Sequence, residues 1–334
     1  MADFRIQPPA IGRARPAQRR PPVQGGYASA LRRVPKAMRR HAAAFASFLK
    51  LAHDITGDAN LEPEAKIAQL DALERALVSG GNVPSWLGPA LELKASLAIT
   101  GGSSLHARQL LQAFRRDAEG YRARTWGDVL AACRLAANPV GHHLLELYGE
   151  SADALAATDA LCTAIRLLRV VQECRDDWVR LGRCYFPLDW FDAVGASPEH
   201  LVEHRATPAI RMVLDRMLDR IDRQLDHARA LPGALRDPGL RMETAVLLHA
   251  ARLMAGRLRR RDPLAQGISL GPLARAWVTI RARLVLARSM AGMAPTPPSG
   301  PPADPDADGP NAGPDAAGPH AQGSDPEQSP RQKG

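Results

Sequence analysis

Apolar residues recur every three to four positions along most of the chain, which is the period of an α-helix packed on one side. Five stripes carry this pattern: Phe45, Phe48, Leu49 and Ala52; Ile67, Leu70, Leu73 and Leu77; Leu161, Ile165, Leu168 and Gln172; Ile210, Val213, Leu214, Met217 and Ile221; Val246, Leu247, Ala250, Leu253 and Met254. No segment alternates convincingly as a strand would. The pattern predicts an all-α protein whose functional side chains point inward from facing helices.

Proline and glycine mark several helix ends. The helix that carries Leu70 is expected to begin near Pro63 and to stop at Gly80 and Gly81. Gly182 is a suitable C-terminal stop for a helix that runs past Asp177. This stop places the next residues, 183–185, near the end of that helix.

Both ends of the chain differ in composition from its middle. Residues 1–26 are basic and proline-rich, and residues 294–334 hold 11 of the 28 prolines but no Val, Ile, Leu, Phe, Trp or Tyr. Such segments bury too little apolar surface to offset the entropy of ordering. We therefore expect tails at 1–26 and 291–334 around one folded helical domain at 27–290.

The positive charge is concentrated at the N-terminus. The first 41 residues hold ten basic side chains and one acid, Asp3, a difference of +9 that equals the net charge of the whole chain. A basic arm can attract nucleic acid, anionic lipid or an acidic substrate, or simply keep the chain in solution. Nucleic acid is not expected as a partner, because no aromatic platform or known binding motif accompanies the arginines.

The sequence also predicts the cellular compartment. No apolar run approaches the ~20 residues of a membrane span, and the N-terminus lacks the apolar core of a secretory signal. The expected location is the cytoplasm, with peripheral contact to the inner face of the membrane as an open option. The four cysteines form no CxxC pair and are expected to be reduced thiols, without a zinc site or a disulfide framework.

Two pairs of acids carry candidate chemistry. Asp54 and Asp58 are four residues apart, as are Glu173 and Asp177, so each pair shares one helix face. Two such helices facing each other across a cavity can hold magnesium ions, and magnesium brings diphosphate. Alternatively, each pair is a solvated helix face, with Glu173 bound only to Arg169, which lies on the same face.

Longer segments resemble a known family. The most telling are LAANPVGHHLLELYGE within 110–150, GRCYFP within 159–190, and HDITGDANLEPEAKIAQLDALERAL at 53–77. In order and spacing they resemble the squalene/phytoene synthase family, and within it the squalene or hydroxysqualene synthases of bacterial hopanoid biosynthesis. The resemblance extends over roughly 260 residues.

The resemblance implies an isoprenoid synthase fold, a single helical domain around a central prenyl pocket. It implies a transferase-type enzyme that ionises a prenyl diphosphate, here farnesyl-derived presqualene diphosphate, with Mg²⁺ as cofactor. The small residues Ala136, Ala137 and Gly141 around Asn138 and Pro139 then either leave room for a prenyl chain or allow close helix packing.

The expected site residues, taken from the spacing and from the resemblance together, fall into two groups. The catalytic group is Asp54, Asp58, Glu173, Asp177 and Tyr185, of which the four acids are also the expected magnesium ligands. The substrate-binding group is Lys50, Asn138, Arg166, Arg169, Gln172 and Arg183. Arg183 is expected to hold a phosphate oxygen, and the ring of Tyr185 to line the path of the carbocation.

The chain departs from the family at this site. In the family's register the first acidic pair falls on His53 and Gly57, one residue before Asp54 and Asp58. Polar amides of the second motif are replaced by Arg166 and Arg169. Two alternatives follow: an active enzyme whose arginines partly replace magnesium, or a non-catalytic relative that binds prenyl diphosphate or assembles beside an active sibling synthase.

Overall fold

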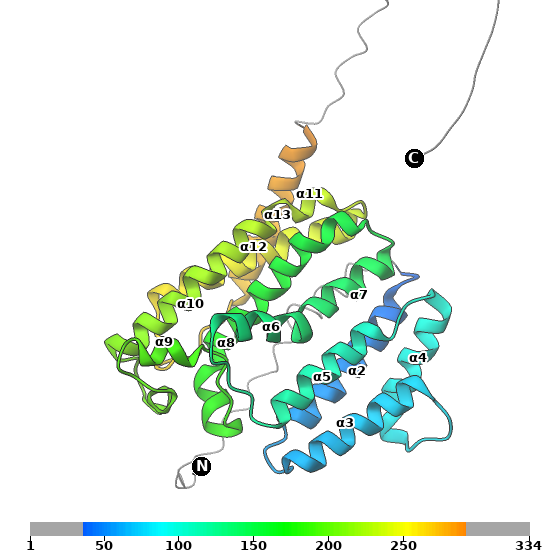
Figure 1. Ribbon diagram of the computed structural model, residues 1–334. Coiled ribbons are helices and arrows are strands. Elements are labelled where there is room, and N and C mark those ends of the chain that lie inside the picture. The colour runs from blue at the N-terminus through cyan, green and yellow to red at the C-terminus, as the bar shows by residue number, and fades with distance from the viewer. Residues whose placement is uncertain (1–35, 292–334) are drawn as a thin grey trace, which may run out of the picture. The chain divides into compact units, whose positions relative to one another are not determined.

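The computed structural model describes residues 36–291, which are almost entirely helical (Figure 1). In chain order the helices are α2 (Arg39–Gly57), α3 (Pro63–Val78), α4 (Gly88–Thr100), α5 (Leu105–Ala118), α6 (Trp126–Ala136), α7 (Asn138–Tyr148), α8 (Leu155–Leu181), α9 (Leu188–Asp192), α10 (Pro208–His227), α11 (Leu231–Ala234), α12 (Pro238–Arg260) and α13 (Pro272–Ala291). Short 3₁₀ turns are η1 (Ser85–Leu87), η2 (Ala152–Ala154), η3 (Pro198–Val202) and η4 (Ala228–Ala230). Within this range the β structure is one isolated bridge, between Arg122 and Cys184. The all-α class is confirmed.

The predicted tails lie outside the described residues, apart from residue 291 at the end of α13. The domain boundaries at 26/27 and 290/291 therefore remain predictions.

Helix ends follow the punctuation of the sequence. Helix α3 begins at Pro63 and ends at Val78, and Gly80 and Gly81 follow with positive φ angles of 71° and 97°. Helix α8 ends at Leu181, where Gly182 adopts the left-handed conformation (φ 63°) that closes the last turn. The predicted start and stops are confirmed.

The buried side chains form two clusters. One lies among α2, α3, α4 and α5 and includes Phe45, Phe48 and Leu73. The other is built around α8 and includes Leu167 and Phe186, with α10, α7 and α12 packed against this long helix. Because α2 and α5 belong to one cluster and α8 to the other, the line where these helices meet is the place to look for a site.

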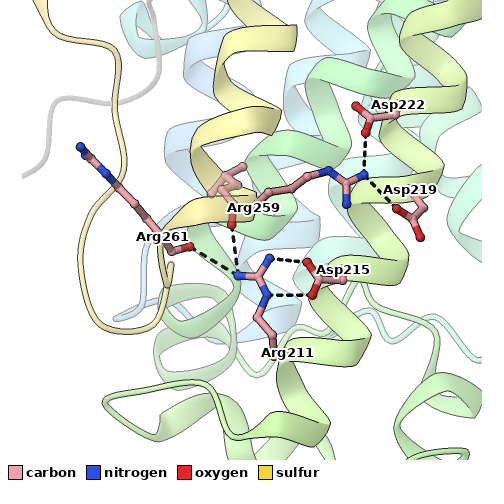
Figure 2. Close-up of polar contacts among 7 residues, drawn as sticks. Arg211, Asp215, Asp219, Asp222, Arg259 and Arg261 are labelled. Carbon is pink, nitrogen blue, oxygen red and sulfur yellow. Dashed lines mark hydrogen bonds and ion pairs between the residues drawn. The ribbon is translucent and has the colours of Figure 1, made fainter.

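Two arginines join α10 to α12 through hydrogen bonds and ion pairs (Figure 2). Arg211 of α10 binds Asp215 in two places and donates to the carbonyls of Leu258 (3.1 Å) and Arg261 (3.4 Å), at the end of α12. Arg259 of α12 donates to Asp219 (2.8 Å) and also binds Asp222. Carbonyls at a helix C-terminus lack intrahelical partners, so Arg211 supplies donors that the helix itself does not have.

The apolar stripe predicted for 246–254 needs a correction. Of its members only Met254 is buried, whereas Ala245, Leu248, Ala251 and Ala255 of the same helix are buried instead. Helix α12 packs on α8 and α10 with one side and on α13 with another. A helix covered on two sides has no single apolar stripe, which is why the periodicity misplaced its centre.

The cysteines are free thiols, as expected, and Cys133, Cys174 and Cys184 are buried. Burial raises the pKa of Cys133 to about 11 and that of Cys162 to about 12. These thiols therefore stay protonated at neutral pH and act as packing groups.

Candidate active site

Arg183 joins the two clusters. The segment after α8 runs beside the segment after α5, with the Cys184 amide donating to the Tyr121 carbonyl (3.1 Å). This pairing aims the buried Arg183 at two helix ends: its Nε donates to the Asp117 carbonyl of α5 (2.6 Å), and its Nη2 to the Thr56 carbonyl of α2 (2.7 Å). Arg183 thus positions the ends of α2 and α5, and these two N–H groups are committed to backbone carbonyls instead of a phosphate.

Beside this joint, α8 presents its charged face. Arg169 donates from Nε to the Glu173 carboxylate (2.7 Å), one turn further along the helix. The two side chains keep only 30% and 26% of their exposure, so this pair is shielded from solvent more than a surface pair would be. The expected sharing of one face by Arg169 and Glu173 is confirmed.

His53 is the residue of α2 that reaches α8. Its Nε2 lies 2.8 Å from Nη2 of Arg169. A guanidinium only donates, so Nε2 must accept and the proton of the neutral ring must sit on Nδ1. Burial, followed by the charge of Arg169, lowers the pKa of His53, which keeps the ring neutral.

Arg166 lies deeper on the same helix. Its guanidinium is 3.9 Å from the Asp117 carboxylate and 4.5 Å above the centre of the Tyr185 ring. Burial opposes its charge, but the neighbouring Tyr185 and Asp117 outweigh this effect and its pKa is raised. Burial and the charge of Asp117 in turn raise the pKa of Tyr185. Arg166 is therefore a permanent cation inside the protein.

The central pocket is narrow. Two cavities adjoin Arg166, Tyr185, Tyr121 and Ala132, and each has room for about one water molecule. Ala136 lines one of them, as expected if small residues make space for a ligand. A prenyl chain needs far more room than either cavity offers, and both cavities are bordered by Arg166 and Tyr185.

Gly141 serves close packing instead. A Cβ at this position would overlap the Thr158 side chain and lie 2.8 Å from Sγ of Cys162, both on α8. Of the two alternatives for the small residues, close packing therefore holds at Gly141, while Ala136 borders the cavity.

Asp177 completes the charged face. Burial raises its pKa to about 6, with Glu173 adding to the rise and Arg166 opposing it. The carboxyl therefore titrates just below neutral pH, in a region that already holds two guanidinium groups.

Asp177 should make folding depend on pH. Because its pKa is higher in the folded than in the unfolded chain, stability falls as pH rises from about 4 through 6. We expect Asp177→Asn to abolish this part of the slope and to raise the free energy of unfolding at pH 7 by about 2 kcal/mol. Urea unfolding at pH 4.5 and 7 measures both, with Asp176→Asn, an exposed neighbour, as the control. An unchanged slope in Asp177→Asn would contradict the assignment.

The first acidic pair lies elsewhere. Asp54 pairs with Lys50 one turn away, and both side chains are more than half exposed. Asp58 follows the end of α2 and accepts from the Asn60 amide (2.8 Å), which is a turn contact. Helix α2 thus turns His53 toward Arg169, in the family's register, while Asp54 points to a solvated side. The metal-binding role of Asp54 and Asp58 remains a prediction.

Two other expected substrate-binding residues make structural contacts. Asn138 accepts a hydrogen bond from Thr163 (3.2 Å), which ties the start of α7 to α8. Gln172 donates to the Ile268 carbonyl (2.7 Å), in the loop before α13. Their side-chain groups are used inside the protein, and a contact with substrate stays a prediction.

The side chains of residues 36–291 do not form a magnesium site by themselves, and binding of Mg²⁺ together with a diphosphate stays a prediction. Mg²⁺ requires near-octahedral oxygen ligands. No group of three or more His, Cys, Asp or Glu side chains that could hold a metal ion occurs between residues 36 and 291. Glu173 is bound by Arg169, and the facing position on α2 is a neutral imidazole. Two guanidinium groups on this face, those of Arg166 and Arg169, are suitable partners for an anion.

Sequence reasoning missed Asp117 and Tyr121. They enter the site because α5 ends beside α8, with Tyr121 packed against Tyr185 at 5.7 Å between ring centres. The signal available was the mixed-charge run Arg115, Arg116 and Asp117 in the last turn of an amphipathic helix, directly before the turn at Gly120.

Comparison with known proteins gives a consistent picture. The family model described as squalene/phytoene synthase matches residues 24–276. A hydroxysqualene synthase of Sinorhizobium fredii is 35% identical over 230 residues, 69% of this chain and 78% of that protein. One of Zymomonas mobilis is 29% identical, over 67% of this chain and 75% of that protein.

Solved structures agree in fold. Squalene synthase HpnC from Alicyclobacillus acidocaldarius superposes with a TM-score of 0.62 at 25% identity, covering 71% of this chain and 88% of that one. A dehydrosqualene synthase solved with a ligand gives a TM-score of 0.64 at 16% identity, covering 80% of this chain and 93% of that one. The isoprenoid synthase fold expected from the sequence is confirmed.

Proposed function

Because the chain belongs to the squalene/phytoene synthase family, we propose that it is an enzyme that ionises a prenyl diphosphate of the presqualene diphosphate type. The family predicted from the sequence is confirmed, and it indicates a squalene-synthase-like enzyme. The substrate and its place among hopanoid or other triterpenoid precursors are our proposal. It is supported by the similarity to hydroxysqualene synthases and by the two arginines on the charged face of α8.

The observation that carries the proposal is the pair Arg166 and Arg169. Both are held at the junction of α8 with α2 and α5, one beside Asp117 and the other beside His53 and Glu173. Loss of diphosphate breaks a carbon–oxygen bond, and the electron pair leaves on the diphosphate oxygen. Guanidinium groups neutralise this charge through charge-assisted, bidentate hydrogen bonds. A carbocation remains on the prenyl chain.

The arginines also bear on the metal dependence that we propose. Arg169 forms an ion pair with Glu173, so the Glu173 carboxylate is not free to bind Mg²⁺. The positive charge of Arg169 is itself a partner for diphosphate. We propose that the protein binds prenyl diphosphate with reduced dependence on magnesium, through Arg166 and Arg169.

The cavity must widen for this function. Arg166 now covers one face of the Tyr185 ring, and about one water molecule fits beside it. Diphosphate offers Arg166 a stronger partner than an aromatic ring does, so ligand binding and movement of this side chain are expected together. The role of Tyr185 toward the carbocation then depends on its ring face becoming free.

Calorimetry tests the proposal. The unaltered protein should bind a non-hydrolysable farnesyl diphosphate analogue both with and without Mg²⁺. In Arg169→Asn the metal-free affinity should fall at least about tenfold, because one charge-assisted contact is lost. Binding should then become magnesium-dependent, since Glu173 is released.

The outcomes separate the alternatives. No binding by the unaltered protein under either condition defeats the ligand role and leaves Arg169 and Glu173 as a structural pair. Binding without conversion of presqualene diphosphate to any product would favour a non-catalytic relative. Arg180→Asn, an exposed arginine near the end of the same helix, is the matched control.

A further inference from the structure

Helix α13 has an uncovered apolar face. It packs on α12 with Val278 and Ala282, which are 1% and 0% exposed. Leu273, Trp277 and Ile280 are instead 86%, 50% and 56% exposed. Their spacings of four and three residues put them within a sector of about 60° of the helix. Three large apolar side chains therefore line up along one exposed stripe.

Arginines flank this stripe. Arg281 and Arg283 are exposed on its two sides, and the guanidinium of Arg281 lies 5.1 Å from the centre of the Trp277 ring. Residues 263–291 contain four arginines and no aspartate or glutamate. An exposed apolar stripe between cationic side chains, with a tryptophan at its centre, matches the boundary between lipid headgroups and acyl chains.

We propose that the face of α13 formed by Leu273, Trp277 and Ile280 lies in the surface of an anionic lipid bilayer. The apolar side chains enter the headgroup boundary, and the flanking arginines bind lipid phosphates. None of the helices between residues 36 and 291 has the length and apolar content needed to cross a bilayer. The contact is thus one along the membrane plane, and it stands independently of the proposed reaction.

Other occupants fit this face less well. A symmetric second copy would bring the arginines of one α13 against those of the other, and such like-charge contacts are unfavourable. The chain's own residues 294–334 contain no Val, Ile, Leu, Phe, Trp or Tyr with which to cover the stripe. Charge complementarity therefore selects an anionic lipid surface.

Vesicle flotation with the full-length chain tests the proposal. Vesicles of phosphatidylcholine mixed with phosphatidylglycerol should carry the unaltered protein with them, and added salt should weaken this binding. The triple variant Leu273→Ser, Trp277→Ser, Ile280→Ser should partition about tenfold less. The double variant Arg281→Gln, Arg283→Gln should lose the preference for phosphatidylglycerol over pure phosphatidylcholine.

A matched triple variant controls for general hydrophobicity. Val78, Ile99 and Met212 are 52%, 64% and 61% exposed on other helices, and their replacement by serine should leave partitioning unchanged. The basic N-terminal arm is identical in all of these proteins. Equal partitioning of the two serine triples would overturn the proposal. The proposal would also be overturned if the unaltered protein bound no vesicles and formed a dimer that the Leu273, Trp277 and Ile280 triple variant abolished.

Discussion

Replacing Arg166 by glutamine, a neutral amide, is expected to lower kcat/KM for presqualene diphosphate by about 100-fold or more. The guanidinium is a permanent cation beside Asp117 and Tyr185, in the interior where charge interactions are strong. Removal of one preorganised donor from developing negative charge typically costs ~10²–10³ in rate. Steady-state kinetics at several magnesium concentrations measures the effect.

The magnesium series makes this experiment decisive. Arg169 still binds Glu173 in Arg166→Gln, so added Mg²⁺ should restore little activity to this variant. It should restore more to the double variant Arg166→Gln, Arg169→Asn, in which Glu173 is released. Arg180→Gln should behave as the unaltered protein does. Full activity of Arg166→Gln without Mg²⁺ would refute the proposed role.

Replacing Arg183 by methionine is expected to lower the free energy of unfolding by about 3 kcal/mol. The change removes two short charge-assisted hydrogen bonds to the carbonyls of Asp117 and Thr56 and leaves both acceptors at a buried joint. Arg183→Lys should recover less than half of the loss, because an ammonium lacks the planar fork that reaches two carbonyls. Urea unfolding of the three proteins gives the comparison.

An exposed arginine near the end of α8 shows how much of the loss in Arg183→Met comes only from removing a positive charge. Arg180→Met, three residues earlier and exposed, should change stability by less than about 0.5 kcal/mol. A loss in Arg183→Met no larger than in Arg180→Met would show that the joint is not stabilising.

Local signals predicted the fold well. The stops at Gly80 and Gly182 depend on one backbone conformation that glycine adopts without strain, so they can be read from the sequence. The stripe of α2, with Phe45 and Phe48, also held because this face meets a single core. The apolar stripe of α12 was misplaced because neighbouring helices cover two sides of this helix. The sequence of α12 alone does not show which helices pack on it.

The site was harder to predict, because it depends on rotation. One residue along a helix is about 100°, and this difference decides whether His53 or Asp54 faces α8. The sequence contained both candidates, and only the packing of α2 shows which of them touches Arg169. Asp117 could not be recognised for a similar reason: it reaches Arg166 through a meeting of helices far apart in the chain.

The contacts of Arg183 bear on how this family can be compared. Its partners at positions 56 and 117 are backbone oxygens, which every amino acid carries. Evolution is therefore free to exchange the side chains at both positions without loosening the joint, and Asp117 can offer its carboxylate to Arg166 at the same time. An analysis of covarying positions would consequently find no partner for Arg183 at either position, although it holds two helices of the site in place.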